Sequence, residues 1–142
     1  MIQNTILNQL NEKGFVVSKI RGVSMWPFFN QKNTQVYIKR TPNYKKNDCI
    51  LFLRFNGQLI LHRILKVKDV YFLVSGDNES VVEKVYLEQI KGCVFEYYKH
   101  GKTKTLTGFR YHVYLIFMKL CRPLRVLRDF IKKFIKKLIG RK

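Results

Sequence analysis

Six segments rich in branched and aromatic residues occupy the stretch between residues 15 and 98, and turn-forming residues separate them. Such segments are typical of short antiparallel strands, because branched and aromatic side chains suit a half-buried pleated surface. Asn56-Gly57 predicts a tight hairpin between two of them. The predicted strands are 15–20, 35–39, 49–55, 59–67, 70–75 and 85–98. The body of the chain is therefore predicted to be mostly β, with an antiparallel sheet.

Apolar residues recur at helical spacing at both ends of the chain. At the N-terminal end they are Ile2, Ile6, Leu7 and Leu10. Gly14 would stop this first helix, and Pro123 would separate an apolar helical segment from the amphipathic one after it. The 142 residues suit one domain. Its predicted organisation is a helix over 1–14, a β domain over 15–100 and a basic helical tail over 101–142.

The positive charge is concentrated at the C-terminal end. The chain has 28 Lys and Arg against 9 Asp and Glu, a formal net charge of +19. Residues 101–142 hold 13 of the basic side chains and 1 of the acidic ones. Because basic and apolar residues interleave at helical spacing over 124–142, we expect an interfacial helix on an anionic membrane surface rather than a nucleic-acid partner. The alternative is a helix that packs its apolar face on the β domain.

Cysteine usage and hydropathy bear on the compartment. Cys49, Cys93 and Cys121 are odd in number and form no CxxC pair, which indicates free thiols rather than a zinc site or a disulfide framework. The N-terminal residues lack a secretory signal pattern, and no stretch reaches the ~18 uncharged apolar residues of a spanning helix. We expect a cytoplasmic, peripherally membrane-associated protein without a metal or cofactor.

Three polar residues are candidates for chemistry. Ser24 lies among apolar residues in "RGVSMWPFF", His62 lies on the apolar strand "LILHRIL", and Asp77 lies in "SGDNES". Taken singly, each has an ordinary structural explanation, as a turn serine, a core histidine and a turn aspartate.

Taken together and in this order, the motifs resemble the signal peptidase family of serine endopeptidases, within the wider group that also contains self-cleaving repressor domains. The matching segments are "GVSMWPFF" (22–29), "KNDCILF" (46–52), "LHRIL" (61–65) and "SGDNES" (75–80). The resemblance spans roughly residues 18–96 and implies an antiparallel β catalytic domain. It implies Ser24 as nucleophile and His62 as general base, which matches the histidine type of the family.

The chemistry explains these residue types. A serine hydroxyl needs a base to take its proton, and an imidazole is largely neutral at pH 7 and can do so. The resemblance also implies that the Ser24 N–H contributes to the oxyanion hole. Asp77 is expected either to orient His62 or to brace the turn, with Glu83 as a second candidate for the orienting role. Residues expected to border the substrate or shield the site are Gly22, Met25, Trp26, Pro27 and Phe28. Residues expected in support are Arg63, through a carboxylate such as Asp77, and Gly76, Asn78 and Glu83.

The predicted function is a serine endopeptidase that cleaves an extended peptide or a leader-type precursor through a Ser–His dyad at a membrane surface. One alternative is an inactive relative that binds peptides, membranes or nucleic acid. A self-cleaving repressor fits poorly, because about 20 residues before the serine motif cannot hold a helix-turn-helix domain.

Overall fold

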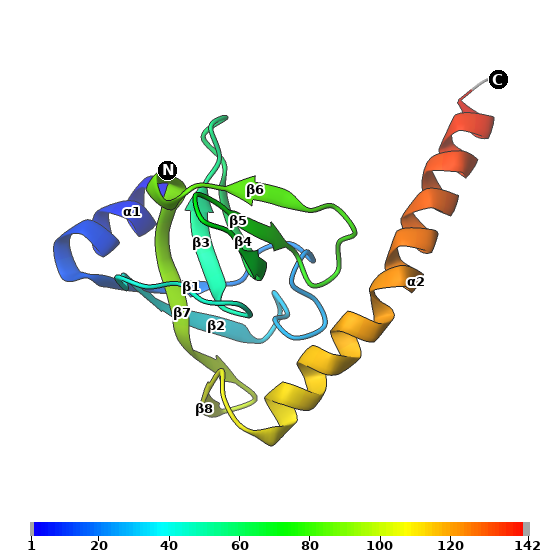
Figure 1. The fold of residues 1–142 in the computed structure, drawn as a ribbon. Coiled ribbons are helices and arrows are strands. Elements are labelled where there is room, and N and C mark those ends of the chain that lie inside the picture. Colours follow the sequence, from blue (N-terminus) through cyan, green and yellow to red (C-terminus); the bar gives the residue numbers. More distant parts are fainter. Residues whose placement is uncertain (1, 141–142) are drawn as a thin grey trace.

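The computed structural model describes residues 2–140, which form two α-helices and one eight-stranded sheet (Figure 1). The helices are α1 (Ile2–Lys13) and α2 (Phe109–Ile139). The strands are β1 (Phe15–Lys19), β2 (Thr34–Lys39), β3 (Cys49–Leu53), β4 (Leu59–Val67), β5 (Phe72–Ser75), β6 (Glu83–Val85), β7 (Ile90–Lys99) and β8 (Lys102–Thr105). This confirms the predicted fold class, a mostly β body with a helix at each end.

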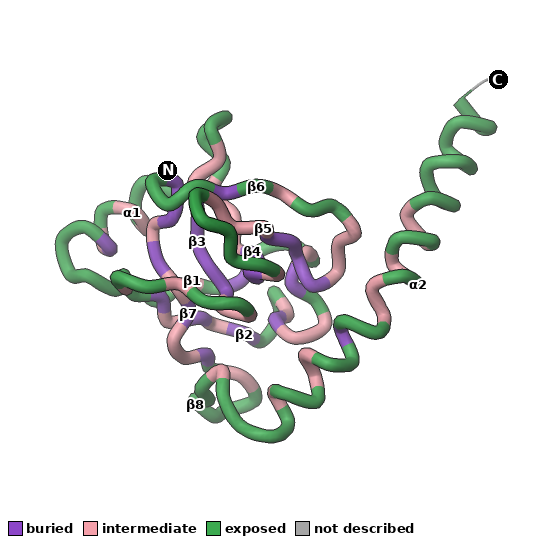
Figure 2. Tube along the Cα trace, viewed as in Figure 1, coloured by how far each residue is buried: buried purple, intermediate pink, exposed green. Residues whose placement is uncertain are grey.

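The sheet is antiparallel at every pairing, in the order β1-β2-β7-β3-β4-β5-β6, and β8 pairs with β7. Two clusters of buried side chains fill it. One gathers around Phe29, Val36 and Ile38 and takes Leu10 from α1; the other gathers around Ile50, Phe52 and Ile64. Figure 2 shows the buried residues concentrated in the β body, while α2 is mostly exposed. Neither of these two clusters includes a residue of α2.

The predicted strand 85–98 is divided in the structure. β6 ends at Val85, a short 3₁₀ helix (η1) covers Leu87–Gln89, and β7 begins at Ile90. The side chain of Gln89 accepts a hydrogen bond from the Tyr86 N–H and donates one to the Leu53 carbonyl. These bonds replace ladder pairing at the bend, so an apolar run that reads as one strand becomes two elements.

The predicted tail also differs in detail. It begins with β8, because His100 and Gly101 both take positive φ angles and reverse the chain into a hairpin. The helix after it runs unbroken through Pro123, which was expected to separate two segments. Proline removes one hydrogen bond of a helix and crowds the preceding turn. In that turn the Arg125 guanidinium donates to the Met118 carbonyl at 2.9 Å, a side-chain bond that supports the weakened stretch.

The first half of α2 runs beside the β body, and its second half projects beyond it (Figure 1). None of the helices within residues 2–140 combines the length and the hydropathy needed to cross a membrane.

Candidate active site

Ser24 lies in the turn that follows β1. Gly22 holds a positive φ of 73°, and its N–H donates to the Gln31 side chain at 3.0 Å. The N–H of Phe29 donates to the Met25 carbonyl at 3.0 Å, which closes a helical turn and buries both side chains in the core. Within the described part of the chain, the Ser24 N–H makes no hydrogen bond. This amide is therefore free to donate a hydrogen bond, which is what a contact to an oxyanion requires.

The turn between β5 and β6 packs directly against the serine turn. The Asn78 N–H donates to the Ser24 carbonyl at 2.8 Å, and the Asn78 side chain donates to the Val23 carbonyl at 3.2 Å. A Cβ at Gly76 would lie only 2.6 Å from the Ser24 carbonyl oxygen. Gly76 and Asn78 thus hold Ser24 in place, the first by its small size and the second by two hydrogen bonds.

His62 sits in the middle of β4, opposite Ile50 of β3, with only 2% of its surface exposed. Its ring packs against the Phe52 ring at a centroid distance of 5.8 Å. Burial lowers the pKa of His62 to about 4; the Glu83 charge opposes this effect, and the Arg54 charge adds to it. The imidazole is therefore neutral at pH 7, which is the form that a general base needs.

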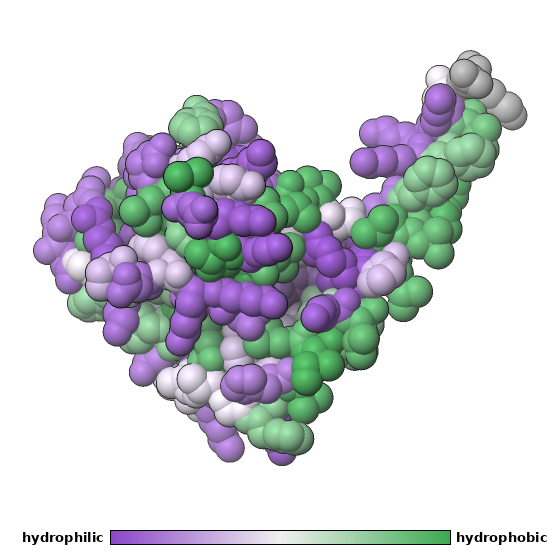
Figure 3. All heavy atoms as spheres, in the orientation of Figure 1, coloured by the Kyte–Doolittle hydropathy of each residue, from purple (hydrophilic) through white to green (hydrophobic). Residues whose placement is uncertain are grey.

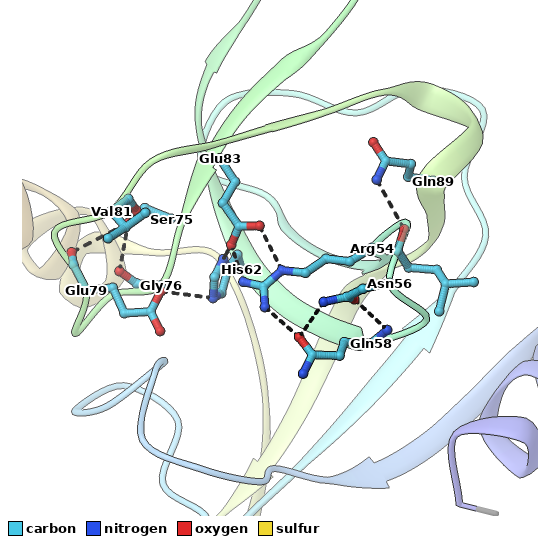
Figure 4. A network of polar contacts seen from close by, with 11 residues as sticks. Arg54, Asn56, Gln58, His62, Ser75, Gly76, Glu79, Val81, Glu83 and Gln89 are labelled. Atoms are coloured by element: carbon cyan, nitrogen blue, oxygen red, sulfur yellow. Dashed lines mark hydrogen bonds and ion pairs between the residues drawn. The ribbon is translucent and has the colours of Figure 1, made fainter.

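Two carboxylates flank the imidazole, as Figure 4 shows. Glu83 Oε1 lies 3.4 Å from His62 Nδ1, and Glu79 Oε2 lies 3.3 Å from Nε2. Nδ1 is buried and makes no hydrogen bond within the described residues. Arg54 Nε donates to Glu83 Oε2 at 2.8 Å and pairs with the second oxygen too, which lowers the pKa of Glu83. Glu83 is thus an ionised, oriented carboxylate beside the buried nitrogen.

Glu79 lies between the two predicted catalytic residues. A Cβ at Gly76 would be 3.1 Å from both the Glu79 carboxyl carbon and the Ser24 Cβ, so these two carbons are at most 6.2 Å apart, twice 3.1 Å. The same carboxyl group contacts His62 Nε2. Burial and the Glu83 charge raise the pKa of Glu79. No hydrogen bond joins Ser24 to His62 within residues 2–140; instead, the Glu79 carboxylate faces the nitrogen that would accept the serine proton.

Asp77 does not occupy the orienting position; its partners lie elsewhere. It forms a bidentate pair with Arg63, with both N–O distances at 2.8 Å, and it accepts a hydrogen bond from Tyr114 of α2 at 2.9 Å. Arg63 also donates to the Asn47 carbonyl and to the Tyr111 hydroxyl. The pairing expected between Arg63 and Asp77 is present, and of the two roles considered for Asp77 the contacts fit bracing. The carboxylate nearest to Nδ1 is Glu83.

A pocket of about 180 Å³ opens beside Ser24. Met25 lines it together with Ile20 and Leu61, while β1 and α1 contribute further wall residues. Gly22, Trp26 and Pro27 do not line this pocket. Trp26 is half exposed, because the helical turn that buries Met25 rotates the next side chain outward.

Phe28, expected to shield the dyad, instead packs against Tyr111 and Tyr114 of α2 and against the guanidinium of Arg63. It therefore joins the Arg63–Asp77 cluster rather than the serine pocket. Here too the helical turn decides the direction of the side chain.

Glu79, Arg54 and Tyr114 were not anticipated as members of the site. Glu79 lies in the motif "SGDNES" and Arg54 in the hairpin "RFNGQ", so both belong to motifs that the sequence already singles out. Tyr114 carries no local signal, because only the docking of α2 brings it to Asp77. Residues 2–140 hold no group of three His, Cys, Asp or Glu side chains arranged to bind a metal ion.

Comparison with known proteins assigns the chain to a family. No curated protein and no solved structure matches the chain. The family model described as Peptidase S24-like matches residues 2–95, which include Ser24, His62, Asp77 and both flanking glutamates. α2 lies outside the match. Since this match covers well over half of the 142 residues, the chain belongs to the Peptidase S24-like family.

Proposed function

We propose that the protein is a serine endopeptidase in which Ser24 is the nucleophile and His62 the general base. The observation that carries the proposal is the convergence of three distant segments on one point. The Gly76–Asn78 turn packs on the Ser24 turn, and the adjoining Glu79 reaches from there to the buried imidazole of His62.

The flanking groups support a definite proton path. With a proton on Nδ1, directed at Glu83, Nε2 carries a lone pair that can accept the Ser24 proton once Glu79 has moved away. Ser24 Oγ then bonds to the carbonyl carbon of the substrate, and the oxyanion that forms accepts a hydrogen bond from the Ser24 N–H. Nε2 passes its proton to the leaving amine as the peptide C–N bond breaks. Water hydrolyses the acyl-enzyme by the same route, and its proton returns through His62 to Ser24.

Catalysis requires that Glu79 leave Nε2. Its side chain is 38% exposed and lies in the loop between β5 and β6, so it can turn toward solvent without disturbing a strand. In enzymes without substrate, catalytic hydrogen bonds are often formed only when the substrate binds. We infer that an entering peptide displaces Glu79 and lets Ser24 approach His62.

The pocket and the strands around it suit an extended peptide. β1 is the terminal strand in the sheet order, and its residues Ser18 and Lys19 line the pocket. A substrate can therefore add to β1 as a further strand, with an apolar side chain in the space beside Ser24 and Met25. The small volume, about 180 Å³, favours a small or medium-sized side chain.

Within the family, we propose the histidine-type, signal-peptidase-like reaction on a leader-type precursor, as opposed to a lysine-dependent reaction. His62 is the side chain at the site that can accept a proton at neutral pH, whereas Lys66 and Lys68 are exposed. An imidazole that is already neutral at pH 7 can accept a proton without any further lowering of its pKa.

The test is cleavage of a mixed peptide library, read by mass spectrometry, with wild-type protein, Ser24→Ala and His62→Gln. We expect the cuts made by wild-type protein to be lost in both variants. Lys66→Gln is the matched control, since it removes an exposed basic residue from the same strand and should leave the cuts unchanged. Cleavage that persists in Ser24→Ala would refute the assignment of the nucleophile.

One observation favours a second candidate, an inactive relative that binds peptides. The Glu79 carboxylate contacts His62 Nε2, the atom that would have to accept the Ser24 proton. The pocket beside Ser24 could bind a peptide side chain even if no peptide bond is cleaved. Glu79→Ala separates the two functions. If Glu79 gates an active dyad, the variant should cleave at least as fast as wild type. Peptide binding without cleavage in both proteins would favour the binding function.

A further inference from the structure

The side of α2 that faces away from the β body is apolar over nearly its whole length. Every third or fourth residue from Val113 to Leu138 is a large apolar side chain, and each is at least 46% exposed. We call this the outer face of α2; it includes Val113, Phe117, Leu120, Leu127, Phe134 and Leu138. Figure 3 shows hydrophobic surface along this side of the helix. At 1.5 Å per residue, the 31-residue helix is roughly 46 Å long.

The opposite side of α2 is already occupied by the β body. Tyr114 donates to Asp77, Arg122 donates to the Ser80 carbonyl, and Arg128 donates to both the side chain and the carbonyl of Asn78. The Ser80 hydroxyl donates to Asp129 at 2.7 Å. These contacts fix the rotation of α2 about its axis, and this rotation keeps the outer face exposed to solvent.

The charge of α2 favours an anionic partner. The helix contains 9 Lys and Arg and 1 Asp, a net charge of +8. Four of the lysines, at 132, 133, 136 and 137, lie on the side opposite to Phe134 and Leu138 in the projecting half. A second copy of the chain packed on the outer face would bring two such helices together and would be opposed by their charge. An anionic bilayer would accept the apolar face and attract the lysines at the same time.

A groove of about 550 Å³ beside α2 also combines apolar and basic side chains. Its lining includes Leu73, Leu115 and Ile116, together with the basic residues Lys46, Lys66 and Lys119. Ile116 is 61% exposed and lies on α2 next to the outer face, so the groove and the face form a continuous surface. A largely apolar groove with a basic rim suits the chain and the headgroup of an anionic lipid.

We propose that the outer face of α2 is a membrane-docking surface that lies flat on an anionic bilayer along the whole helix, with the β body on the aqueous side. The sequence predicted an interfacial segment over 124–142 only; the structure extends the surface back to Val113. Docking would hold the loop that carries Glu79 at a set height above the lipid, since α2 is bonded to that loop at Asn78 and Ser80.

The experiment measures flotation of the full-length protein with vesicles of phosphatidylcholine, with and without phosphatidylglycerol. Phe117→Ser and Phe134→Ser are a matched pair, because both side chains are 55% exposed and they lie in the two halves of the helix. Phe55→Ser is the control, since Phe55 is 83% exposed at the hairpin between β3 and β4. We expect binding to need the anionic lipid. Each α2 variant should weaken it by on the order of tenfold, and Phe55→Ser should leave it unchanged.

Four results would overturn the proposal. Equal binding to neutral vesicles, or none to anionic ones, would remove the bilayer as partner. A loss confined to Phe134→Ser would restrict docking to the end of the helix. Self-association of wild-type protein in sedimentation velocity, abolished by both α2 variants, would assign the face to a second copy. Ser24→Ala should bind vesicles like wild type, so failure of docking and failure of catalysis are separately visible.

Discussion

The buried imidazole of His62 makes a quantitative prediction about stability in acid. Its pKa is about 4 in the folded protein against 6.5 for an exposed histidine. Above pH 6.5 the ring is neutral in both the folded and unfolded states. As the pH falls below 6.5, His62 becomes protonated in the unfolded chain but stays neutral in the folded protein, so the free energy of unfolding decreases until about pH 4. Integrated to pH 4.5, this difference costs ~2.5 kcal/mol.

Urea unfolding of wild-type protein and His62→Gln at pH 7 and pH 4.5 measures this cost. Other groups titrate in both proteins, so the informative quantity is the difference between the two pH-dependent losses. We expect wild type to lose ~2.5 kcal/mol more than the variant. Parallel losses would refute the statement that His62 is held neutral by burial. If His62 is also the general base, the acid limb of kcat/KM should lie near pH 4 rather than 6.5.

Three further predictions concern buried groups. Asp77→Asn should lower the free energy of unfolding by ~3 kcal/mol or more in a urea titration, because it leaves the buried Arg63 guanidinium without its charged partner; a loss under 1 kcal/mol would contradict this account. Gly76→Ala should reduce peptide cleavage and destabilise the fold by about 1–3 kcal/mol, since its Cβ would meet the Ser24 carbonyl at 2.6 Å; wild-type cleavage rates would show that the turn yields freely. Burial raises the pKa of the Cys49 thiol to about 12, so iodoacetamide should label it ~1000-fold more slowly in native than in urea-unfolded protein, as read by peptide mass spectrometry, and equal rates would exclude burial.

Local patterns predicted the elements well where each segment decides its own structure. The alternation around His62 and the Asn56-Gly57 turn indicated β3, β4 and the hairpin between them, and the structure has all three. The pattern failed at Tyr86–Gln89, where a long-range bond from Gln89 to the Leu53 carbonyl stabilises a turn inside an apolar run. Propensity cannot register a partner more than 30 residues away.

In the candidate site too, local motifs predicted some features, while distant contacts decide the others. Motif order was enough to nominate Ser24, His62 and the pairing of Arg63 with a carboxylate, and the structure brings the three segments together. Which carboxylate faces the imidazole was not predictable, because three acidic residues lie within seven positions of one another. The choice depends on how the loop between β5 and β6 folds over Gly76, and on Arg54 from another hairpin.

The bonds between α2 and the loop at Asn78 and Ser80 divide the helix into two parts, one that depends on contacts with the β body and one that does not. Up to Asp129, its polar side chains pair with specific donors and acceptors on this β body, so the orientation of that part depends on the body. Beyond Asp129, residues 130–139 make no hydrogen bond to the β body within the described chain. If the last segment is fused to an unrelated soluble carrier, it should keep its affinity for anionic vesicles. The segment before it should lose its orientation, because its partners on the β body are missing. The first part of the helix is thus specific to this β body, and the last part is independent of it.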